Sequence, residues 1–292
     1  MTTISICTLA HGREDHLRNL VSGLNHSQRP PCELVVAVMQ DHRYDLPSTS
    51  FPVRQILLGD KGICLAEARN TAAREARGDL LIFLDVDCIP APRLVEDYAV
   101  AAAFNEGVLM GEVGYLPKGA TDRGIDYAVF DRLAVKHADR AGPPRGMVGK
   151  CGDYRCFWSL NFALHAATFR AIGGFDPRYV GYGGEDPDFG RAIVSKDIPL
   201  WWAKGAKAYH QYHKHHMPPV HHLDSVVANA QIFAEKNRAI ADRPEFICEN
   251  LRNPRFRGDR KITSSLAPLP AGERAEGRVR GKKNGKLFLN NS

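Results

Sequence analysis

Two aspartates follow a strongly apolar segment, a position where carboxylates make a poor core and a good cation site. Residues 79–84 are predicted to form a buried strand, and Asp85 and Asp87 come directly after it in DVDCIP. Since they are two residues apart on an extended edge, both carboxylates are expected on the same side of the chain. Carboxylate oxygens bind divalent cations, which complete their coordination with substrate phosphates and water. The pair therefore predicts a metal that holds a phosphorylated substrate. The structural alternative is a pair of acids that caps the turn before Pro90.

A common phosphate-binding loop does not accompany this pair. The chain has neither G-x-x-x-x-G-K-[ST] nor G-x-G-x-x-G after a predicted strand. ATPase and dinucleotide-dependent oxidoreductase functions therefore lose their best support. The phosphates of a nucleotide would be neutralised by the metal and by scattered bases, for which we predict Arg13, Lys61 and Arg69.

Six of the twelve histidines are concentrated between His210 and His222, in HQYHKHHMPPVHH. His210 and His213 are three residues apart, a spacing that lets two ligands converge on one ion. Imidazole accepts Mn²⁺ and Zn²⁺, whereas Ca²⁺ and Mg²⁺ prefer oxygen. A mixed carboxylate and imidazole site with open positions for phosphate favours Mn²⁺. The alternative is a polar surface loop that binds metal adventitiously, and we assign the other four histidines of the cluster to it.

A second acidic pair follows two glycines in GYGGEDPDF, where Glu185 and Asp186 begin a helical stretch. Acidic residues in a first helical turn are favoured by the helix dipole, which is a sufficient structural explanation. Gly183 and Gly184, however, permit close approach of a ligand. A carboxylate beside a pocket can act as a general base toward a hydroxyl. Together with a metal–diphosphate site upstream, the pattern favours the general base.

The elements that must position these residues alternate between strands and helices in the first half of the chain. Apolar runs predict strands, and helical spacing predicts helices, which together imply a mostly parallel central sheet with flanking helices. Ligands bind such sheets beyond the carboxyl ends of the strands. That rule places Thr8, Arg13, Gln40 and Asp85 at one edge. The predicted strands are 4–9, 34–39, 53–58 and 79–84, and the predicted helices are 13–24 and 65–77.

The second half is less regular. A Gly/Pro-rich stretch within 140–155 is long enough to be a mobile active-site loop. No apolar run approaches the ~20 residues that a spanning helix needs, and no basic leader precedes the first apolar run. Helices are predicted at 93–104, 122–137 and 223–237 and from Glu185 onward, and short strands at 201–203 and 206–210.

Composition and charge set wider limits. The chain of 292 residues is 44% hydrophobic and 25% charged, which excludes a disordered or fibrous protein. The net charge of +6 lies entirely in residues 252–292, which carry +8, while residues 1–251 carry −2. We predict a basic, disordered tail and no required nucleic-acid partner; weak binding of the tail to anionic surfaces or to nucleic acid is the alternative. Seven scattered cysteines indicate reduced thiols and a cytoplasmic location.

Four motifs occur in order over residues 3–240: GREDHL, DVDCIP, SLNFALHAATFRAIGGFDPRYVGYGGEDPDF and HQYH. Together they resemble a GT-A, family-2-like glycosyltransferase, and more closely the β-1,4-galactosyltransferase group. The resemblance implies an α/β GT-A (nucleotide-diphospho-sugar transferase) fold over residues 1–251. Residues 1–115 would be the nucleotide-sugar-binding half and residues 116–251 the acceptor-binding, catalytic half. The tail has no counterpart in the group.

The resemblance also implies roles on the donor side. Asp87 and His213 would be Mn²⁺ ligands, and His210 stands where the group often has a methionine. Asp85 and Arg13 would face the nucleotide. With Thr8, Gln40, Lys61 and Arg69 from the strand-edge and charge arguments, these residues complete the predicted donor site.

On the acceptor side, Asp186 would be the catalytic base, and Glu185 and Tyr182 would line the acceptor sugar beside Gly183 and Gly184. Two positions depart from the group. Tyr182 replaces a tryptophan, and Pro187 stands where a further acceptor-binding aspartate is expected. Because both departures concern the acceptor site, they leave the identity of the acceptor less certain than the type of reaction.

The predicted function is therefore metal-dependent, inverting transfer of a hexose from a nucleotide-sugar to a hydroxyl of a glycan or lipid-linked acceptor. UDP-galactose and a UDP-N-acetylhexosamine are the expected donors. One alternative is a sugar nucleotidyltransferase, whose Gly-rich basic loop after the first strand is absent from TLAHGRED. Another is a non-catalytic protein that binds a sugar nucleotide or a metal. The cytoplasmic location leaves open peripheral contact of the tail with the inner face of the membrane.

Overall fold

The structure is a computed structural model that describes residues 2–60, 62–137, 148–214 and 223–241. It divides into two compact units, Met1–Asn237 and Arg238–Ser292, and the sheet with its covering helices belongs to the first. The predicted tail at 252–292 and its boundary lie outside the described residues. So do Lys61 and the first half of the predicted 140–155 loop, residues 140–147.

A mixed nine-stranded sheet forms the centre of the first unit, in the order β3-β2-β1-β4-β8-β6-β9-β5, with β7 paired to β9. The four strands predicted in the first half are confirmed, and they are parallel to one another. The strands are β1 (Ile4–Ala10), β2 (Glu33–Val38), β3 (Val53–Leu57), β4 (Leu80–Leu84), β5 (Cys88–Pro90), β6 (Val108–Tyr115), β7 (Val148–Lys150), β8 (Asn161–His165) and β9 (Leu200–His210).

The second half of the sheet is mixed rather than mostly parallel. Asn161, the first residue of β8, pairs with Leu84, the last residue of β4, so β8 runs antiparallel to β4. The strands predicted at 201–203 and 206–210 are one strand, β9, which continues through Gly205 at a φ of 87°. The Gly205 N–H donates to the Glu112 carboxylate at 3.0 Å, where the register between β6 and β9 shifts.

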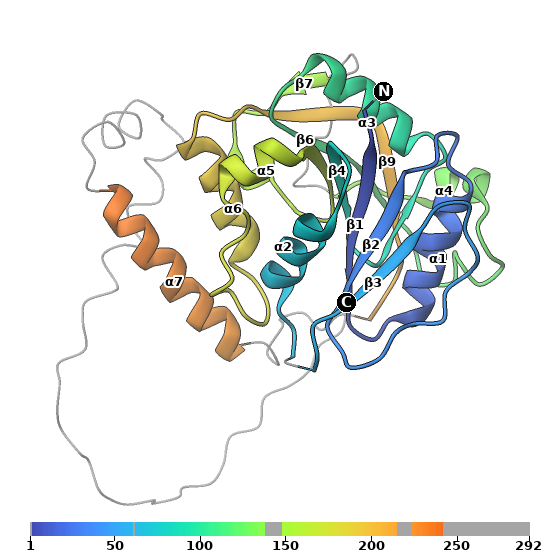
Figure 1. The fold of residues 1–292 in the computed structure, drawn as a ribbon, viewed down its shortest axis with the longest axis horizontal. Coiled ribbons are helices and arrows are strands. Elements are labelled where there is room, and N and C mark those ends of the chain that lie inside the picture. The colour runs from blue at the N-terminus through green and yellow to red at the C-terminus, as the bar shows by residue number, and fades with distance from the viewer. Residues whose placement is uncertain (1, 61, 138–147, 215–222, 242–292) are drawn as a thin grey trace, which may run out of the picture. The chain divides into compact units, whose positions relative to one another are not determined.

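Helices cover both faces of the sheet (Figure 1). The predicted helix at 122–137 is much shorter, because the Asp126 side chain caps its start and Val135 leaves it to pair with Tyr115. The helices are α1 (Glu14–Asn25), α2 (Leu65–Glu75), α3 (Leu94–Phe104), α4 (Tyr127–Leu133), α5 (Ala166–Ile172), α6 (Glu185–Ser195) and α7 (Leu223–Ala241), with a 3₁₀ helix at Tyr154–Cys156.

Residues that alternate along the strands contribute to two hydrophobic cores, one on each face of the sheet. Ile6 and Ile82 point to the face covered by α1 and α3, while Cys7 and Phe83 point to the face covered by α2, α5 and α6. Burial of each such large side chain contributes roughly 1.5–3 kcal/mol, and this fixes the register of the strands. Among the described helices, none is both long and apolar enough to cross a membrane.

Because β1, β2 and β4 are parallel, the segments that follow them meet at one edge. Arg13 comes after β1, Gln40 after β2, and Asp85 and Asp87 after β4. The fold therefore gathers most of the predicted donor residues at the carboxyl edge of the sheet, as predicted.

Candidate active site

One carboxylate and two imidazoles meet at this edge. Asp87 lies in the turn between β4 and β5, and the antiparallel pairing of β5 with β9 sets Cys88 opposite His210. His210 Nε2 lies 3.5 Å from Asp87 Oδ1, and His213 Nε2 lies 3.5 Å from Asp87 Oδ2. The candidate ligand atoms of the three residues lie within 4.8 Å of one another. The three predicted metal ligands are thus neighbours in the structure.

The chemistry of this donor set fits a divalent transition metal. Asp87 is buried, and its Oδ2 accepts a hydrogen bond from Arg13 Nη1 at 2.5 Å. Burial and the positive charge of Arg13 lower the pKa of His213, which favours the neutral imidazole that a metal binds. Two nitrogens and one carboxylate suit Mn²⁺, Zn²⁺ and related ions. Substrate phosphates and water would complete the coordination.

Arg13 is presented by a constrained turn between β1 and α1. It has a φ of 49°, a left-handed conformation that is uncommon for a residue other than glycine and that often marks functional sites. Gln40 Oε1 accepts the Gly12 N–H at 3.1 Å, and the Tyr44 hydroxyl donates to the Gly12 carbonyl at 2.8 Å. Gln40 therefore supports the turn that carries Arg13. Tyr44, which the sequence did not single out, does the same.

Two further predicted donor residues are buried. Thr8 is on β1, and its Oγ1 has no hydrogen-bond partner among the described residues. Arg69 projects from the apolar face of α2 and donates from Nη2 to Asp85 Oδ1 at 2.9 Å. Its Nη1 lies 3.7 Å from Glu185 Oε1, and its guanidinium carbon lies 5.3 Å from the centre of the Phe175 ring. Arg69 thus connects the carboxyl end of β4 with the first turn of α6.

The start of α6 carries the second acidic pair. Gly184 precedes it with a φ of 94°, and a Cβ there would lie 2.7 Å from the Tyr179 ring, so the position requires glycine. Asp186 Oδ2 accepts the Ser159 N–H at 3.0 Å, whereas its Oδ1 is buried with no hydrogen-bond partner in the described part of the chain. A buried acceptor without a donor is rare in proteins. Asp186 Oδ1 therefore keeps an acceptor position that no described donor fills.

The surroundings of Glu185, the neighbour of Asp186, favour the protonated form of its carboxyl group. Burial and the negative charge of Asp186 raise its pKa to about 7, against the opposing effect of Arg69. A carboxylic acid with a pKa near neutrality beside an ionisable carboxylate is an arrangement found in acid–base sites. Tyr182, in contrast, is half exposed on the loop before α6.

Some residues of the site were missed because their role depends on distant partners. Gln211 stands between His210 and His213, the two histidines predicted as metal ligands, and is buried; its N–H donates to the Asp87 carbonyl at 2.7 Å. Its side chain accepts from Asn19 Nδ2 at 2.8 Å and donates to the His16 carbonyl at 3.1 Å. These bonds fix the end of β9 against α1. In the sequence, Gln211 gave no signal other than its place in HQYH.

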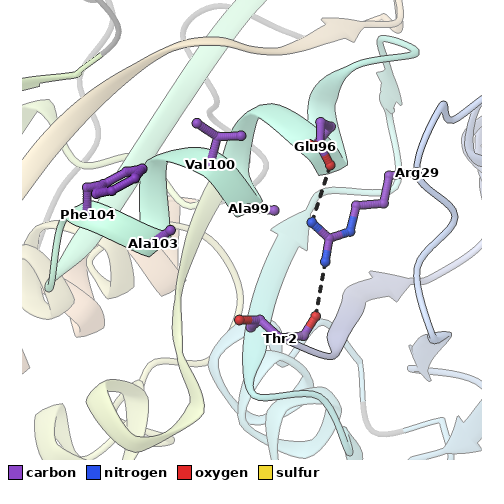
Figure 2. Close-up of a pocket in the computed structure, with 7 residues that line it drawn as sticks. All are labelled: Thr2, Arg29, Glu96, Ala99, Val100, Ala103 and Phe104. Carbon is purple, nitrogen blue, oxygen red and sulfur yellow. Dashed lines mark hydrogen bonds and ion pairs between the residues drawn. The ribbon is translucent and has the colours of Figure 1, made fainter.

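A pocket that lies along α3 contains none of the predicted site residues (Figure 2). At one end, Arg29 Nη1 bonds Glu96 Oε2 at 3.2 Å, and Arg29 Nη2 donates to the Thr2 carbonyl at 3.2 Å. The pocket is lined by Thr2, Arg29, Glu96, Ala99, Val100, Ala103 and Phe104.

Two family models match separate segments of the chain. Residues 5–119 match glycosyl transferase family 2, and residues 148–216 match the family described as the N-terminal domain of galactosyltransferase. The first match spans β1 to β6, including Arg13, Asp85 and Asp87. The second spans Asp186, His210 and His213. The predicted likeness to family 2 and to galactosyltransferases is thus confirmed at the level of these families.

The chain is also similar to validoxylamine A glucosyltransferases of Streptomyces hygroscopicus. It is 28% identical over 176 residues to the protein of subsp. jinggangensis strain 5008, which is 51% of this chain and 39% of that protein. It is also 28% identical over 176 residues to the protein of subsp. limoneus. The match therefore spans about two fifths of the length of the curated relatives.

Solved structures show the fold. GalNAc-T7, crystallised with UDP, GalNAc and Mn²⁺, superposes with a TM-score of 0.53 at 17% identity, over 73% of this chain and 44% of that one. Staphylococcus aureus TarS 1–349 in complex with UDP-GlcNAc has a TM-score of 0.53 at 12% identity, over 77% of this chain and 61% of that one. The predicted GT-A fold is thereby confirmed.

Proposed function

We propose that this chain is a metal-dependent, inverting glycosyltransferase that moves a hexose from a nucleotide-sugar to a hydroxyl of a glycan or lipid-linked acceptor. The observation that carries the proposal is the convergence of Asp87, His210 and His213 at the carboxyl edge of the sheet. The matches to family 2 and to the galactosyltransferase family support it. Asp186, with its unpartnered oxygen, supplies the base that such a reaction needs.

In the proposed reaction, an oxygen of the acceptor hydroxyl attacks the anomeric carbon of the donor from the face opposite the diphosphate. The bond between the anomeric carbon and the diphosphate oxygen breaks, and the nucleoside diphosphate leaves with the electron pair. Asp186 takes the hydroxyl proton on Oδ1 while the Ser159 N–H holds Oδ2. A divalent cation held by Asp87, His210 and His213 would neutralise the leaving diphosphate.

The other residues of the site bind and orient. Arg13, which is two-fifths exposed, places a positive charge beside Asp87 where the diphosphate is expected. Arg69 is too buried to neutralise a phosphate directly. It holds Asp85 for the nucleotide through the 2.9 Å hydrogen bond.

We propose a UDP-sugar as the donor, with UDP-galactose and a UDP-N-acetylhexosamine as the first candidates. UDP in the GalNAc-T7 structure and UDP-GlcNAc in the TarS complex support this choice. The glucosyltransferase relatives add UDP-glucose as a candidate. The acceptor would bind beside Tyr182 and the glycines before α6. A cytoplasmic location, with contact of the basic tail with the inner face of the membrane, stays a prediction.

Substitution of the proposed base tests the mechanism. Asp186→Asn keeps the shape of the side chain and removes its basicity, so we expect transfer from a UDP-sugar to fall by at least about 100-fold. Binding of UDP and Mn²⁺, measured by calorimetry, should not change. Asp197→Asn is the matched control, because Asp197 is exposed just after α6 and its φ of 54° suits asparagine. Full activity of Asp186→Asn would overturn the assignment of the base.

A further inference from the structure

The glycine-rich loop before α6 is held by a side chain from α7. Asn229 is buried, and its Nδ2 donates to the carbonyls of Val180, Tyr182 and Gly183 at 3.0, 3.3 and 2.7 Å. Partly buried carbonyls need donors, and residues 180–183 lie in no helix or strand that would supply them. One amide therefore fixes the backbone path over four consecutive residues.

The same helix contacts the loop at a second point. Ser225, one turn before Asn229, accepts the Tyr182 N–H on Oγ at 3.2 Å. Gly181 has a φ of 79°, and a Cβ there would lie 2.5 Å from the Ser225 Cβ. The loop thus packs on α7 so closely that glycine is required.

A third contact lies two turns further along α7. Lys236 Nζ lies 2.9 Å from Asp176 Oδ2 and 2.6 Å from Asp188 Oδ2, and both carboxylates are largely buried. Asp176 begins the segment that leads into the loop, while Asp188 belongs to the first turn of α6, two residues after Asp186. The charge of Lys236 therefore ties together both ends of the segment 176–188.

These contacts all reach the acceptor side of the proposed site. Ser225, Asn229 and Lys236 of α7 make all of these hydrogen bonds to residues 176–188. The metal ligands and Arg13 are held by other elements, namely β4, β9 and α1. The two halves of the site thus rest mainly on separate parts of the chain; Arg69, which contacts both Asp85 and Glu185, and the 2.8 Å hydrogen bond from the Gly181 N–H to the Ile63 carbonyl connect them.

We propose that α7 is the positioning element of the acceptor site and that Asn229 is its central positioning residue. This inference rests on the proposed function. Asn229 holds the loop that carries Tyr182 and Gly183 in the conformation that leads into Asp186. Asn229 therefore affects how the acceptor hydroxyl is positioned for reaction, whereas other residues of the site bind the donor.

The test compares Asn229→Asp with Gln231→Glu. Both replace an amide by a carboxylate on α7, but Gln231 is exposed. Asn229→Asp keeps the size of the side chain and removes the donor to the three carbonyls. We expect hydrogen exchange at the Tyr182 amide, which donates to Ser225 on α7, to accelerate at least about tenfold, and exchange in Gln231→Glu to match the wild type.

Activity supplies the readout that a purely structural role would not move. With UDP-galactose and UDP-glucose as donors and free N-acetylglucosamine and glucose as acceptors, Asn229→Asp should lose at least about tenfold in kcat/KM for the acceptor. The KM for the donor and the rate of donor hydrolysis by water should stay within twofold of the wild type. An equal loss on the donor and acceptor sides would overturn the inference.

Lys236→Met is the second variant, used because Asn229→Asp could fail to fold. It keeps the apolar stem and removes the charge, so exchange within 176–188 should accelerate in this variant as well. Unchanged exchange protection in both variants overturns the inference, whatever their activity. Absence of any donor turnover by the wild-type protein counts against the proposed function instead, and the exchange comparison then decides the role of α7.

Discussion

Glu185 provides a prediction whose size follows from the structure. Its side chain is one-tenth exposed, its nearest positive group is Arg69 at 3.7 Å, and Asp186 is its neighbour in the chain. These surroundings raise its pKa from 4.5 to about 7. Burial is the largest cause, followed by the charge of Asp186. The substitution Glu185→Gln removes the titration and keeps the shape of the side chain.

The sign of the effect follows from the proton balance. Below pH 4.5, Glu185 is protonated in both the folded and the unfolded chain, so its titration does not affect stability. Between pH 4.5 and 7 the unfolded chain loses the proton first, and the free energy of unfolding falls with rising pH. Each pKa unit corresponds to about 1.4 kcal/mol. A shift of this size therefore destabilises the wild-type protein by roughly 3 kcal/mol above pH 7 relative to pH 4.

Urea unfolding of the metal-free protein between pH 4 and pH 8 measures this effect. Relative to the wild type, Glu185→Gln should gain about 3 kcal/mol between these limits, with half of the gain near pH 6. Glu185→Gln also loses the contact with Arg69. That loss shifts the free energy of unfolding of the variant by the same amount at every pH and leaves its pH dependence unchanged. Glu14→Gln is the matched control, because Glu14 is also the first residue of a helix but is exposed. Parallel curves for the wild type and Glu185→Gln would refute the reasoning.

Two further substitutions test the backbone and the charge of the site. Gly184→Ala should lower the free energy of unfolding by at least about 2 kcal/mol, because of the positive φ and the 2.7 Å approach to the Tyr179 ring; a loss below about 0.5 kcal/mol in urea would contradict this. Arg13→Ala should tighten binding of Mn²⁺ without nucleotide by roughly three- to tenfold, because it removes a cation hydrogen-bonded to Asp87. The same variant should weaken binding of UDP, and electron paramagnetic resonance of free Mn²⁺ follows both effects; an unchanged Mn²⁺ affinity would argue against competition at Asp87.

The sequence predicted the parts of the site that local patterns specify. The apolar run before Asp85 fixed β4, and the parallel alternation in the first half placed Arg13 and Gln40 at the same edge. The three-residue spacing of His210 and His213 predicted that they converge on one ion, and the family resemblance added Asp87, which lies beside both in the structure. These predictions succeed because strand periodicity and the rule for carboxyl edges need no knowledge of distant contacts.

Other parts depend on contacts that sequence patterns do not contain. The direction of β8 follows from where the chain re-enters the sheet, beside Leu84, which no local pattern specifies. Arg69 was predicted as a base for phosphate, and only the fold, which brings this residue of α2 close to the end of β4 and to the first residue of α6, gives it Asp85 and Glu185 as partners. Asn229 gave no signal because an asparagine in a helix acquires its role only from the carbonyls it meets.

The most direct test of the central claim is release of UDP and transfer of labelled sugar from a panel of UDP-sugars, with the metal removed and then restored. The proposed function predicts turnover with Mn²⁺, loss of turnover with EDTA and recovery when Mn²⁺ is added back. It also predicts that His213→Ala loses both Mn²⁺ binding and turnover. Turnover that persists without any divalent cation, or a His213→Ala variant that binds Mn²⁺ and transfers sugar like the wild type, would contradict the metal-dependent mechanism.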